Sequence, residues 1–286
     1  MNRRHSWVES VAVHATLLLA VAVALYPVLW VIALALSGTA SPQARALPWP
    51  DSPTLEHLDA VMGATKQTAD GDVWLFGRQL ANSLVVAGAT AVVGVAIAIP
   101  TAYALARFRF VGKSLGMRSL LATQMFPAVA SAIPLYLTLD ALGLLNSRTG
   151  LILCYASTSV PFAIFQLRAA FESIPIDLEE AAMVDGATRW QAFVKVVLPV
   201  ARPAIAVTAL FAFMSAYNEF ILAATLLDDE TMFTLPVMLQ HFIGEYDAQW
   251  EKFAAGALIV SLPVMALFYV VQRHLVSGLA SGGVKG

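Results

Sequence analysis

Long apolar stretches alternate with polar segments along the whole chain. Crossing about 30 Å of hydrocarbon takes roughly 20 predominantly apolar residues in a helix. Six stretches reach or approach this length, at residues 11–36, 83–106, 119–139, 150–167, 204–227 and 253–271. Strong alternation with a period of two, the mark of a membrane β-barrel, is absent. The pattern therefore predicts an all-α polytopic membrane protein with six transmembrane helices.

The composition supports this prediction. Hydrophobic residues make up 59% of the chain and charged residues 13%, and the mean hydropathy is +0.73. Soluble domains carry about 45–50% apolar and about 25% charged residues, so much of the apolar surface must face lipid. A net charge of −2 argues against nucleic-acid binding. The single cysteine, Cys154, excludes an internal disulfide.

The first apolar stretch has an alternative interpretation as a signal peptide. Arg3 and Arg4 would supply its charged start, and 44–46 has the small-x-small form of a cleavage site. The apolar run spans about 26 residues, whereas the apolar core of a signal peptide spans about 7–15. The length favours a retained membrane anchor.

Lys and Arg in the segments between the spans predict the orientation, because cytoplasmic segments carry an excess of both. With the N-terminus inside, the external loops hold five, Arg45, Lys66, Arg78, Arg148 and Lys252. The cytoplasmic segments hold twelve, Arg3, Arg4, Arg107, Arg109, Lys113, Arg118, Arg168, Arg189, Lys195, Arg202, Arg273 and Lys285. Both termini are predicted to be cytoplasmic.

This orientation divides the chain into three regions. Residues 1–10 form a cytoplasmic N-terminus, 11–271 the transmembrane domain and 272–286 a cytoplasmic tail. The transmembrane domain carries two long external loops, 37–82 and 228–252, and a cytoplasmic loop at 174–203. Four prolines in the first external loop predict an extended, partly irregular cap.

A catalytic or metal-binding constellation is not recognisable. The five histidines are scattered without ligand spacing, and no G-x-S-x-G occurs. Gly112-Lys113-Ser114 imitates the end of a P-loop, but Arg107 stands where that motif requires glycine. The sequence therefore predicts a non-enzymatic protein that does not bind ATP through this motif.

The cytoplasmic loop has the signals of a helical hairpin. Pro175 suits a helix start, Asp177 is a candidate cap with Glu180 as its capping-box partner, and Gly186 is expected to end the first helix. Thr188 is expected to restart a helix, with Gln191 three residues later.

The second predicted helix is amphipathic. Trp190, Phe193, Val194 and Val197 share one face at helical spacing, and Pro199 is expected to stop the helix before Pro203 and the next span. From the residues alone, the hairpin is either an amphipathic element lying on the membrane or a docking element for a soluble partner.

The residues of this loop resemble a known family. Glu180-Ala181-Ala182 and Gly186 are followed by nine residues and then by Val196-Val197-Leu198-Pro199. This resembles the EAA loop of binding-protein-dependent ABC importer permeases, E-A-A-x-x-x-G, nine residues, I-x-L-P, with valine in place of isoleucine. The resemblance implies a coupling helix seated in a cleft of an ATPase subunit. It implies these coupling residues: Glu180, Ala181, Ala182, Asp185, Gly186, Ala187, Phe193, Leu198 and Pro199.

Other segments resemble the smaller permease subunit of maltose/maltodextrin importers. They are residues 107–113, 124–128 and the glycine-rich tail 278–286. The resemblance implies that the tail enters the ATPase dimer through Gly282, Gly283 and Lys285. Without the resemblance, the tail has no structural propensity of its own and would be a frayed terminus.

The resemblance also implies a set of partners. They are a second permease subunit, two copies of an ABC ATPase that hold ATP and Mg, a periplasmic or lipid-anchored sugar-binding protein, and the lipid of a bacterial inner membrane. This chain itself is expected to hold no cofactor and no metal.

The last external loop is the predicted contact with the binding protein. It carries Phe233, Phe242, Tyr246 and Trp250, which are costly to expose together. Gln240, Phe242 and Tyr246 are the residues predicted to make this contact. The alternative is an interfacial segment whose aromatic side chains mark the membrane boundary.

One span contains an ionisable residue. Glu219 follows Tyr217 and Asn218 within the fifth apolar stretch, and a carboxylate in a span is by default a functional hypothesis. These three residues either line a sugar path or hold two subunits together by hydrogen bonds.

The sequence thus predicts a permease subunit of an ATP-driven importer for maltose/maltodextrin-like oligosaccharides. Import of another sugar or polyol, such as trehalose or glycerol phosphate, is one alternative. An ion-coupled secondary transporter with Glu219 as its proton site is a second. Prolines within several spans are either hinges or static kinks.

Overall fold

A computed structural model describes residues 7–38, 47–50, 52–69, 71–244 and 248–282. The chain divides into two compact units, residues 1–76 with 239–262 and residues 77–238 with 263–286. The order of elements is α1 (Trp7–Ala35), α2 (Glu56–Met62), β1 (Thr65–Thr68), β2 (Gly71–Trp74), α3 (Leu75–Arg107), α4 (Lys113–Met125), α5 (Ala128–Ala141), α6 (Arg148–Ser173), α7 (Asp177–Val184), α8 (Arg189–Ala192), the π-helical segment η1 (Phe193–Val197), α9 (Leu198–Tyr217), α10 (Ile221–Leu226), α11 (Leu235–Gln240) and α12 (Trp250–Gly282).

The described residues contain five helices that are long and apolar enough to cross a membrane. They are α1, α3, α6, the continuous stretch from α8 to α9, and α12. The pair α4 and α5 makes a sixth if it counts as one span, although its two halves are bent by 102°. The prediction of a helical membrane protein is therefore confirmed.

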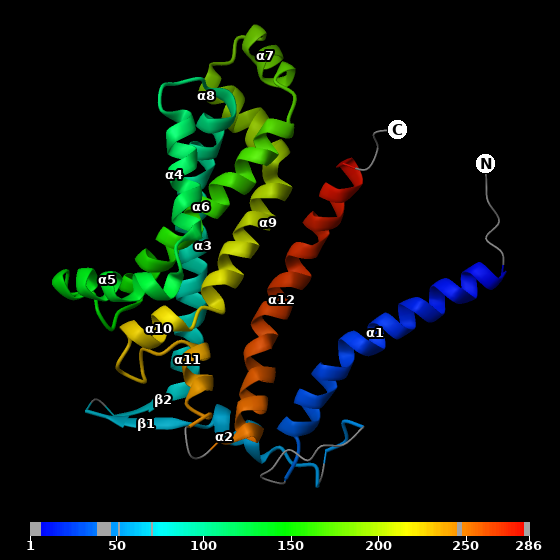
Figure 1. The fold of residues 1–286 in the computed structure, drawn as a ribbon, viewed down its shortest axis with the longest axis vertical. Helices are drawn as coiled ribbons and strands as arrows, with labels where there is room; N and C mark the ends of the chain where they lie inside the picture. Colours follow the sequence, from blue (N-terminus) through cyan, green and yellow to red (C-terminus); the bar gives the residue numbers. More distant parts are fainter. Residues whose placement is uncertain (1–6, 39–46, 51, 70, 245–247, 283–286) are drawn as a thin grey trace. The chain divides into compact units, whose positions relative to one another are not determined.

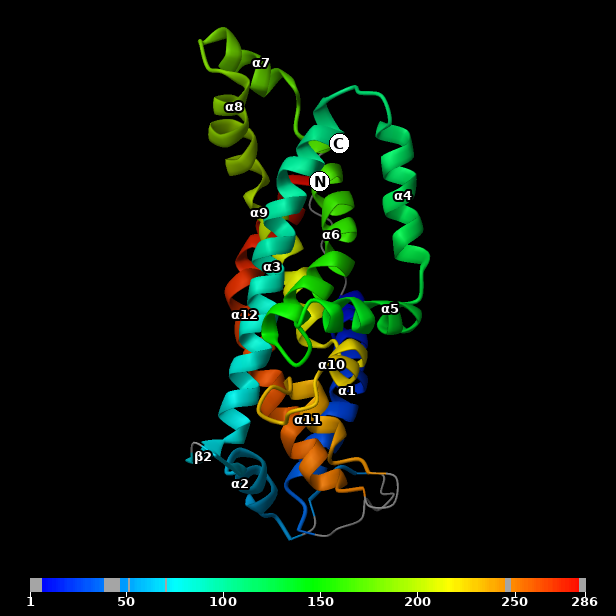
Figure 2. The same cartoon turned by 90° about the vertical axis from the view of Figure 1, so that its left-hand side faces the viewer.

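The third predicted span is not one continuous helix. The chain breaks between α4 and α5 at Phe126, where φ is −78° and ψ is 128°. Phe126 precedes Pro127, and the proline ring disfavours the helical region for the residue before it. The break sets α5 crosswise to α4, as both views show (Figures 1 and 2).

Other boundaries also differ from the prediction. α3 begins at Leu75, eight residues before the expected start at 83. The fifth span ends at Tyr217 instead of 227, because the chain leaves the helix and restarts as α10 at Ile221. α12 continues through Gly282, so residues 272–282 are helical and the alternative of a frayed terminus does not hold there.

The first external segment is more regular than expected. Within the first unit, β1 and β2 pair antiparallel from Thr65 opposite Trp74 to Thr68 opposite Gly71. The indole of Trp74 donates to the Met62 carbonyl, which ties this hairpin to α2. This small sheet is a departure from the all-α prediction.

The second unit is built around three helices, α3, α6 and α9, which lie side by side (Figure 1). Their shared core contains small residues, including Ala98, Ala102, Ala163 and Ala201. Small residues let membrane helices approach closely. At one end, this core passes into an aromatic cluster of Tyr103, Phe171 and Phe193, next to α7, α8 and η1.

Candidate functional site

The candidate site is the hairpin formed by α7, α8 and η1. Gly186 makes its turn with φ at +92°. The Ala187 N–H donates to the Ala182 carbonyl at 3.0 Å, and the Gly186 N–H donates to the Met183 carbonyl at 3.1 Å. This pair of bonds is the Schellman motif, which needs the left-handed conformation that glycine adopts without strain. The predicted end of the first helix is confirmed.

The cap of the second helix is also confirmed. The Gln191 N–H donates to the Thr188 hydroxyl at 3.3 Å, and the Thr188 N–H donates to the Gln191 side chain at 2.8 Å. These two bonds close a capping box at the start of α8.

The predicted cap of the first helix is wrong. The residue that caps α7 is Ile176, and its side chain makes no capping bond. The N–H groups of Glu179 and Glu180 both donate to the Ile176 carbonyl. Because the turn already begins at Pro175, Asp177 lies inside the first turn and cannot act as its cap.

Pro199 does not stop the second helix, contrary to the prediction. The chain is helical from Arg189 to Tyr217 without a break. In η1 the hydrogen bonds widen, and the Leu198 N–H reaches the Phe193 carbonyl five residues back. α9 restarts after this bulge with Pro199 in its first turn, where an absent N–H costs least.

The same bulge divides the predicted apolar face. Phe193 and Val197 are buried, whereas Trp190 and Val194 are exposed. A π-helical turn inserts one extra residue and changes which side chains share a face. The hairpin therefore buries one half of that face and presents the other half outward.

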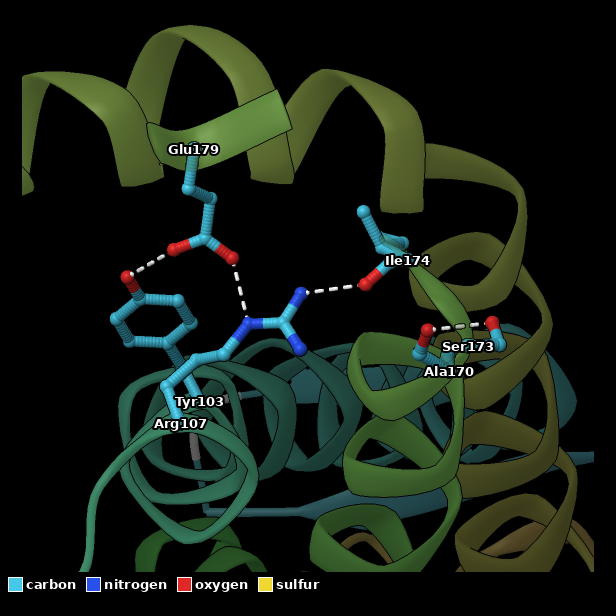
Figure 3. Close-up of polar contacts among 6 residues, drawn as sticks. All are labelled: Tyr103, Arg107, Ala170, Ser173, Ile174 and Glu179. Carbon is cyan, nitrogen blue, oxygen red and sulfur yellow. Dashed lines mark hydrogen bonds and ion pairs between the residues drawn. The ribbon is translucent and has the colours of Figure 1, made fainter. Parts of the chain in front are cut away.

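A polar network fixes α7 to the end of α3. Glu179 is 4% exposed, and its carboxylate accepts from the Tyr103 hydroxyl at 2.6 Å and from Arg107 Nε at 2.5 Å. Arg107 Nη2 also donates to the Ile174 carbonyl at 2.8 Å. Figure 3 shows Tyr103 and Arg107 rising from α3 toward Glu179. The sequence analysis did not identify Tyr103, Arg107 or Glu179 as part of the site.

An aromatic cluster lies beneath this network. The ring of Tyr103 lies 4.3 Å from that of Phe193 and 6.0 Å from those of Phe171 and Phe108. The Arg189 guanidinium lies 5.2 Å from the Phe108 ring centroid. Pairs of this kind add about 0.5–1.5 kcal/mol each beyond their buried area. The base of the hairpin is therefore a packed, rigid support.

The far side of the hairpin is open. Among the predicted coupling residues, Glu180, Ala181, Asp185 and Gly186 are exposed. Ala182, Ala187, Leu198 and Pro199 are partly buried, and Phe193 lies in the core.

Two large apolar side chains accompany the exposed residues, Val184 at 87% and Trp190 at 68% exposure. Exposed apolar side chains among polar ones are typical of a protein-binding surface.

The predicted path residues do not form one surface. Tyr217 is buried and stacks on Phe213 at 5.5 Å, whereas the Asn218 side chain is exposed and donates to its own helix at the Met214 carbonyl. Glu219 is half-buried, and its two oxygens accept from the N–H groups of Leu222 and Ala223 at 2.9 and 3.1 Å. Its carboxylate thus caps α10, a structural role that the sequence did not reveal.

The last external loop is anchored to α3. The Asn82 side chain is fully buried and donates to the carbonyls of Thr231 and Phe233, both at 2.9 Å. Its oxygen accepts from Arg148 Nε at 2.8 Å. Gln79 donates to the Glu230 carbonyl in the same loop. The sequence analysis did not identify this attachment.

The remaining predicted contacts are only partly described. Phe233 is buried, which corrects its expected place among exposed aromatics, because it packs where Asn82 holds the loop. Gln240 is exposed and Phe242 partly buried. Gly282 ends α12, whereas Tyr246, Gly283 and Lys285 lie outside the described residues. Within the described ranges, no cluster of three metal-binding side chains occurs.

Residues 94–281 match the family model described as the binding-protein-dependent transport system inner membrane component. The matched stretch includes the hairpin and most of the chain, so this protein belongs to that family of multi-pass membrane permeases. The resemblance read from the coupling loop is thereby confirmed.

Individual relatives within this family give a more specific similarity. The chain is similar to the maltose/maltodextrin transport system permease protein MalG of Vibrio vulnificus (strain YJ016), at 39% identity over 83% of each chain. It is 37% identical to the protein of that name from Escherichia coli (strain K12), over 96% of this chain and 95% of the relative. A bacterial ABC transporter for import of the acidic polysaccharide alginate has a chain with a TM-score of 0.75 at 27% identity, covering 96% and 98%.

Proposed function

We propose that this chain is the permease subunit of an ATP-driven importer for maltose or maltodextrin-like oligosaccharides. The observation that carries the proposal is similarity along nearly the whole chain to MalG permeases, at 37% identity over 96% of this chain for the Escherichia coli relative. The chain would catalyse no covalent step. ATP and Mg would be held by two copies of a partner ATPase, whose closure this chain would convert into opening of a sugar path.

The hairpin is the proposed docking element for that ATPase. Its support comes from the rigid aromatic base and from the outward surface around Val184, Trp190 and the EAA-type residues. A short helix held by side chains on one side and open on the other can receive a partner without unfolding. The excess of Lys and Arg in the predicted inner segments favours a cytoplasmic hairpin and cytoplasmic termini.

The other proposed contacts follow the predicted division of the chain. The tail after 272 would approach the ATPase dimer through Gly282, Gly283 and Lys285. The loop 228–252 would contact a periplasmic or lipid-anchored sugar-binding protein through Gln240, Phe242 and Tyr246. A second permease subunit would complete the path, and one solved relative of the fold is a complex with a pentasaccharide-bound periplasmic protein.

The role of Glu219 bears on the competing mechanism. An ion-coupled mechanism would need Glu219 to face a transport path. Both of its carboxylate oxygens instead accept from backbone N–H groups at the start of α10, so the side chain is engaged as a helix cap. This arrangement favours a structural role, with path lining by Tyr217 and Asn218 still a prediction.

Transport by the purified complex in proteoliposomes tests the proposal. We expect uptake that requires ATP and the binding protein and that persists when ionophores abolish the ion gradients. Uptake driven by an ion gradient without ATP would refute an ATP-driven importer. Competition with maltose, maltotriose, trehalose, glycerol phosphate and alginate oligosaccharides identifies the substrate class, and maltodextrins should compete best.

A pair of glycine variants tests the docking role of the hairpin. Gly186 and Gly143 both have positive φ, at +92° and +64°, and both donate an N–H to a helix carbonyl. Gly186→Pro and Gly143→Pro therefore remove the same kind of backbone interaction at two places. We expect Gly186→Pro alone to abolish ATPase stimulation by the binding protein, with membrane insertion retained. Normal stimulation in Gly186→Pro would exclude docking through this hairpin.

A further inference from the structure

The way in which α7 is held is unusual for a short helix. Of its eight residues, all of them described, the one that is buried is a carboxylate, Glu179. Its apolar neighbours Leu178 and Val184 are exposed. Isolated helices of this length are not stable in water, and apolar packing normally fixes them in a protein. Here a charged side chain takes that place, so the orientation of α7 depends on the partners of Glu179.

Both partners come from α3. Tyr103 and Arg107 lie four residues apart and therefore point from the same face of that helix. The Tyr103 ring is fixed by the aromatic cluster, and the Arg107 guanidinium is fixed by a second bond to the Ile174 carbonyl. Glu179 thus meets two side chains that cannot follow it if α7 moves alone (Figure 3).

Burial makes the contact between Arg107 and Glu179 sensitive to the loss of either partner. The side chains of Arg107 and Glu179 are 9% and 6% exposed, so little water is present to replace either partner. Removing one member of a buried pair leaves the other charge without compensation, which is far more costly than losing a surface pair. The ion pair of Arg168 with Glu172, four residues apart on α6, is much more exposed and serves as an internal comparison.

We propose that Glu179, Arg107 and Tyr103 form a lock that makes the hairpin and α3 move as one body. Glu179 is a positioning residue: it touches neither the sugar nor the ATPase, and it transmits displacement of α7 to a membrane-spanning helix. This inference rests on the proposed docking of the hairpin. In this proposal, displacement of α7 reaches α3 directly through these side chains. This contact acts in addition to the covalent connections of the hairpin to α6 and α9.

Three variants remove separate parts of the lock. Glu179→Gln removes the charge and keeps the side-chain shape. Arg107→Lys keeps the charge but loses the planar fork that reaches both Glu179 and the Ile174 carbonyl. Tyr103→Phe keeps the ring in the aromatic cluster and removes the hydroxyl. Glu172→Gln, which removes a charge from the exposed pair, is the matched control.

The first measurement is the number of sugars imported per ATP hydrolysed by the reconstituted complex. We expect the ratio to fall by at least about tenfold in Glu179→Gln, less in Arg107→Lys and Tyr103→Phe, and by less than about twofold in Glu172→Gln. ATP hydrolysis and assembly of the complex should persist, because the aromatic support remains. A purely structural defect would lower assembly and hydrolysis together.

The second measurement is the distance between spin labels at Leu178 on α7 and Val92 on α3, both exposed positions. We expect a narrow distribution in the otherwise unchanged protein whose mean stays the same when ATP binds, because the hairpin and α3 move together, and a broad distribution in Glu179→Gln. If Glu179→Gln fails to assemble, Arg107→Lys is the deciding variant. A wild-type ratio with a narrow distribution in either variant would overturn the lock.

The glycine variants separate the two proposals. If Gly186→Pro abolishes coupling while Glu179→Gln and Arg107→Lys behave as wild type, the hairpin docks but the lock does not exist. If Gly186→Pro is normal, the docking proposal itself fails.

Discussion

The attachment of the last external loop offers a test with a magnitude set by the structure. Asn82→Leu keeps the approximate side-chain size and removes three hydrogen bonds, two to the carbonyls of Thr231 and Phe233 and one from Arg148. A neutral bond contributes about 0.5–1.5 kcal/mol and a bond to a charged group about 1.5–3 kcal/mol, which gives about 2.5–6 kcal/mol in total.

The expected loss lies in the lower part of that range. The bonds to Thr231 and from Arg148 are only partly buried, so water can replace some of what is lost. We therefore expect Asn82→Leu to lower the free energy of unfolding by about 3 kcal/mol.

Unfolding in mixed micelles with increasing SDS gives the free energy, and hydrogen exchange across 228–235 localises the change. Asn218→Leu is the matched control, since the exposed Asn218 bonds only within its own helix among the described contacts. Its expected effect is within about 0.5 kcal/mol. If Asn82→Leu lies within the same margin, or if exchange in the loop is unchanged, the anchoring role of Asn82 is wrong.

Three further changes test local features. Thr188→Ala should destabilise the hairpin by about 0.5–2 kcal/mol through loss of the capping box, seen as faster limited proteolysis there, with Thr225→Ala as control. Glu219→Leu should speed hydrogen exchange at Ala223 on α10, whereas Glu219→Gln should preserve protection, and equal exchange in both would contradict the cap. Pro127→Ala should reduce the bend of 102° between α4 and α5, measured between spin labels, and an unchanged angle would show that packing alone sets it.

Sequence patterns predicted the structure correctly where the interaction that decides it joins residues close together in the chain. Gly186 and Thr188 were identified because a left-handed turn and a capping box involve neighbours within five positions. The apolar character of the spans was also predictable, since membrane thickness imposes a minimum length, and five or six such spans occur in the described residues. The EAA-type residues then identified the family, which the family model that matches residues 94–281 confirmed.

Prolines show where local signals fail. The rule that a helix ends before proline holds at Pro127 but fails at Pro199 and Pro203, which lie within a continuous helix. A proline in a helix interior costs about 3 kcal/mol, and packing can offset that amount. At Pro199, the π-helical segment accommodates the absence of the proline N–H. A sequence pattern does not report whether such an adjustment is available.

The sequence analysis missed the part of the candidate site whose interacting residues lie far apart in the chain. Glu179 and Glu180 are adjacent carboxylates, yet Glu179 is buried and Glu180 exposed. The difference arises from Tyr103 and Arg107, which precede Glu179 by 76 and 72 residues. Acidic residues in a first turn fit the helix dipole equally well at either position. Only the packing of α7 on α3 distinguishes them.

The two unpredicted attachments share one helix. Asn82 lies near the start of α3 and Arg107 at its end, and the 25 residues between them correspond to about 38 Å of helix. This exceeds a hydrocarbon core of about 30 Å, so both polar groups can lie at membrane–water boundaries, where polar contacts cost least. In the proposed orientation, α3 then carries the external loop at one boundary and the hairpin at the other. A displacement received by the hairpin would therefore reach the external loop through one continuous helix.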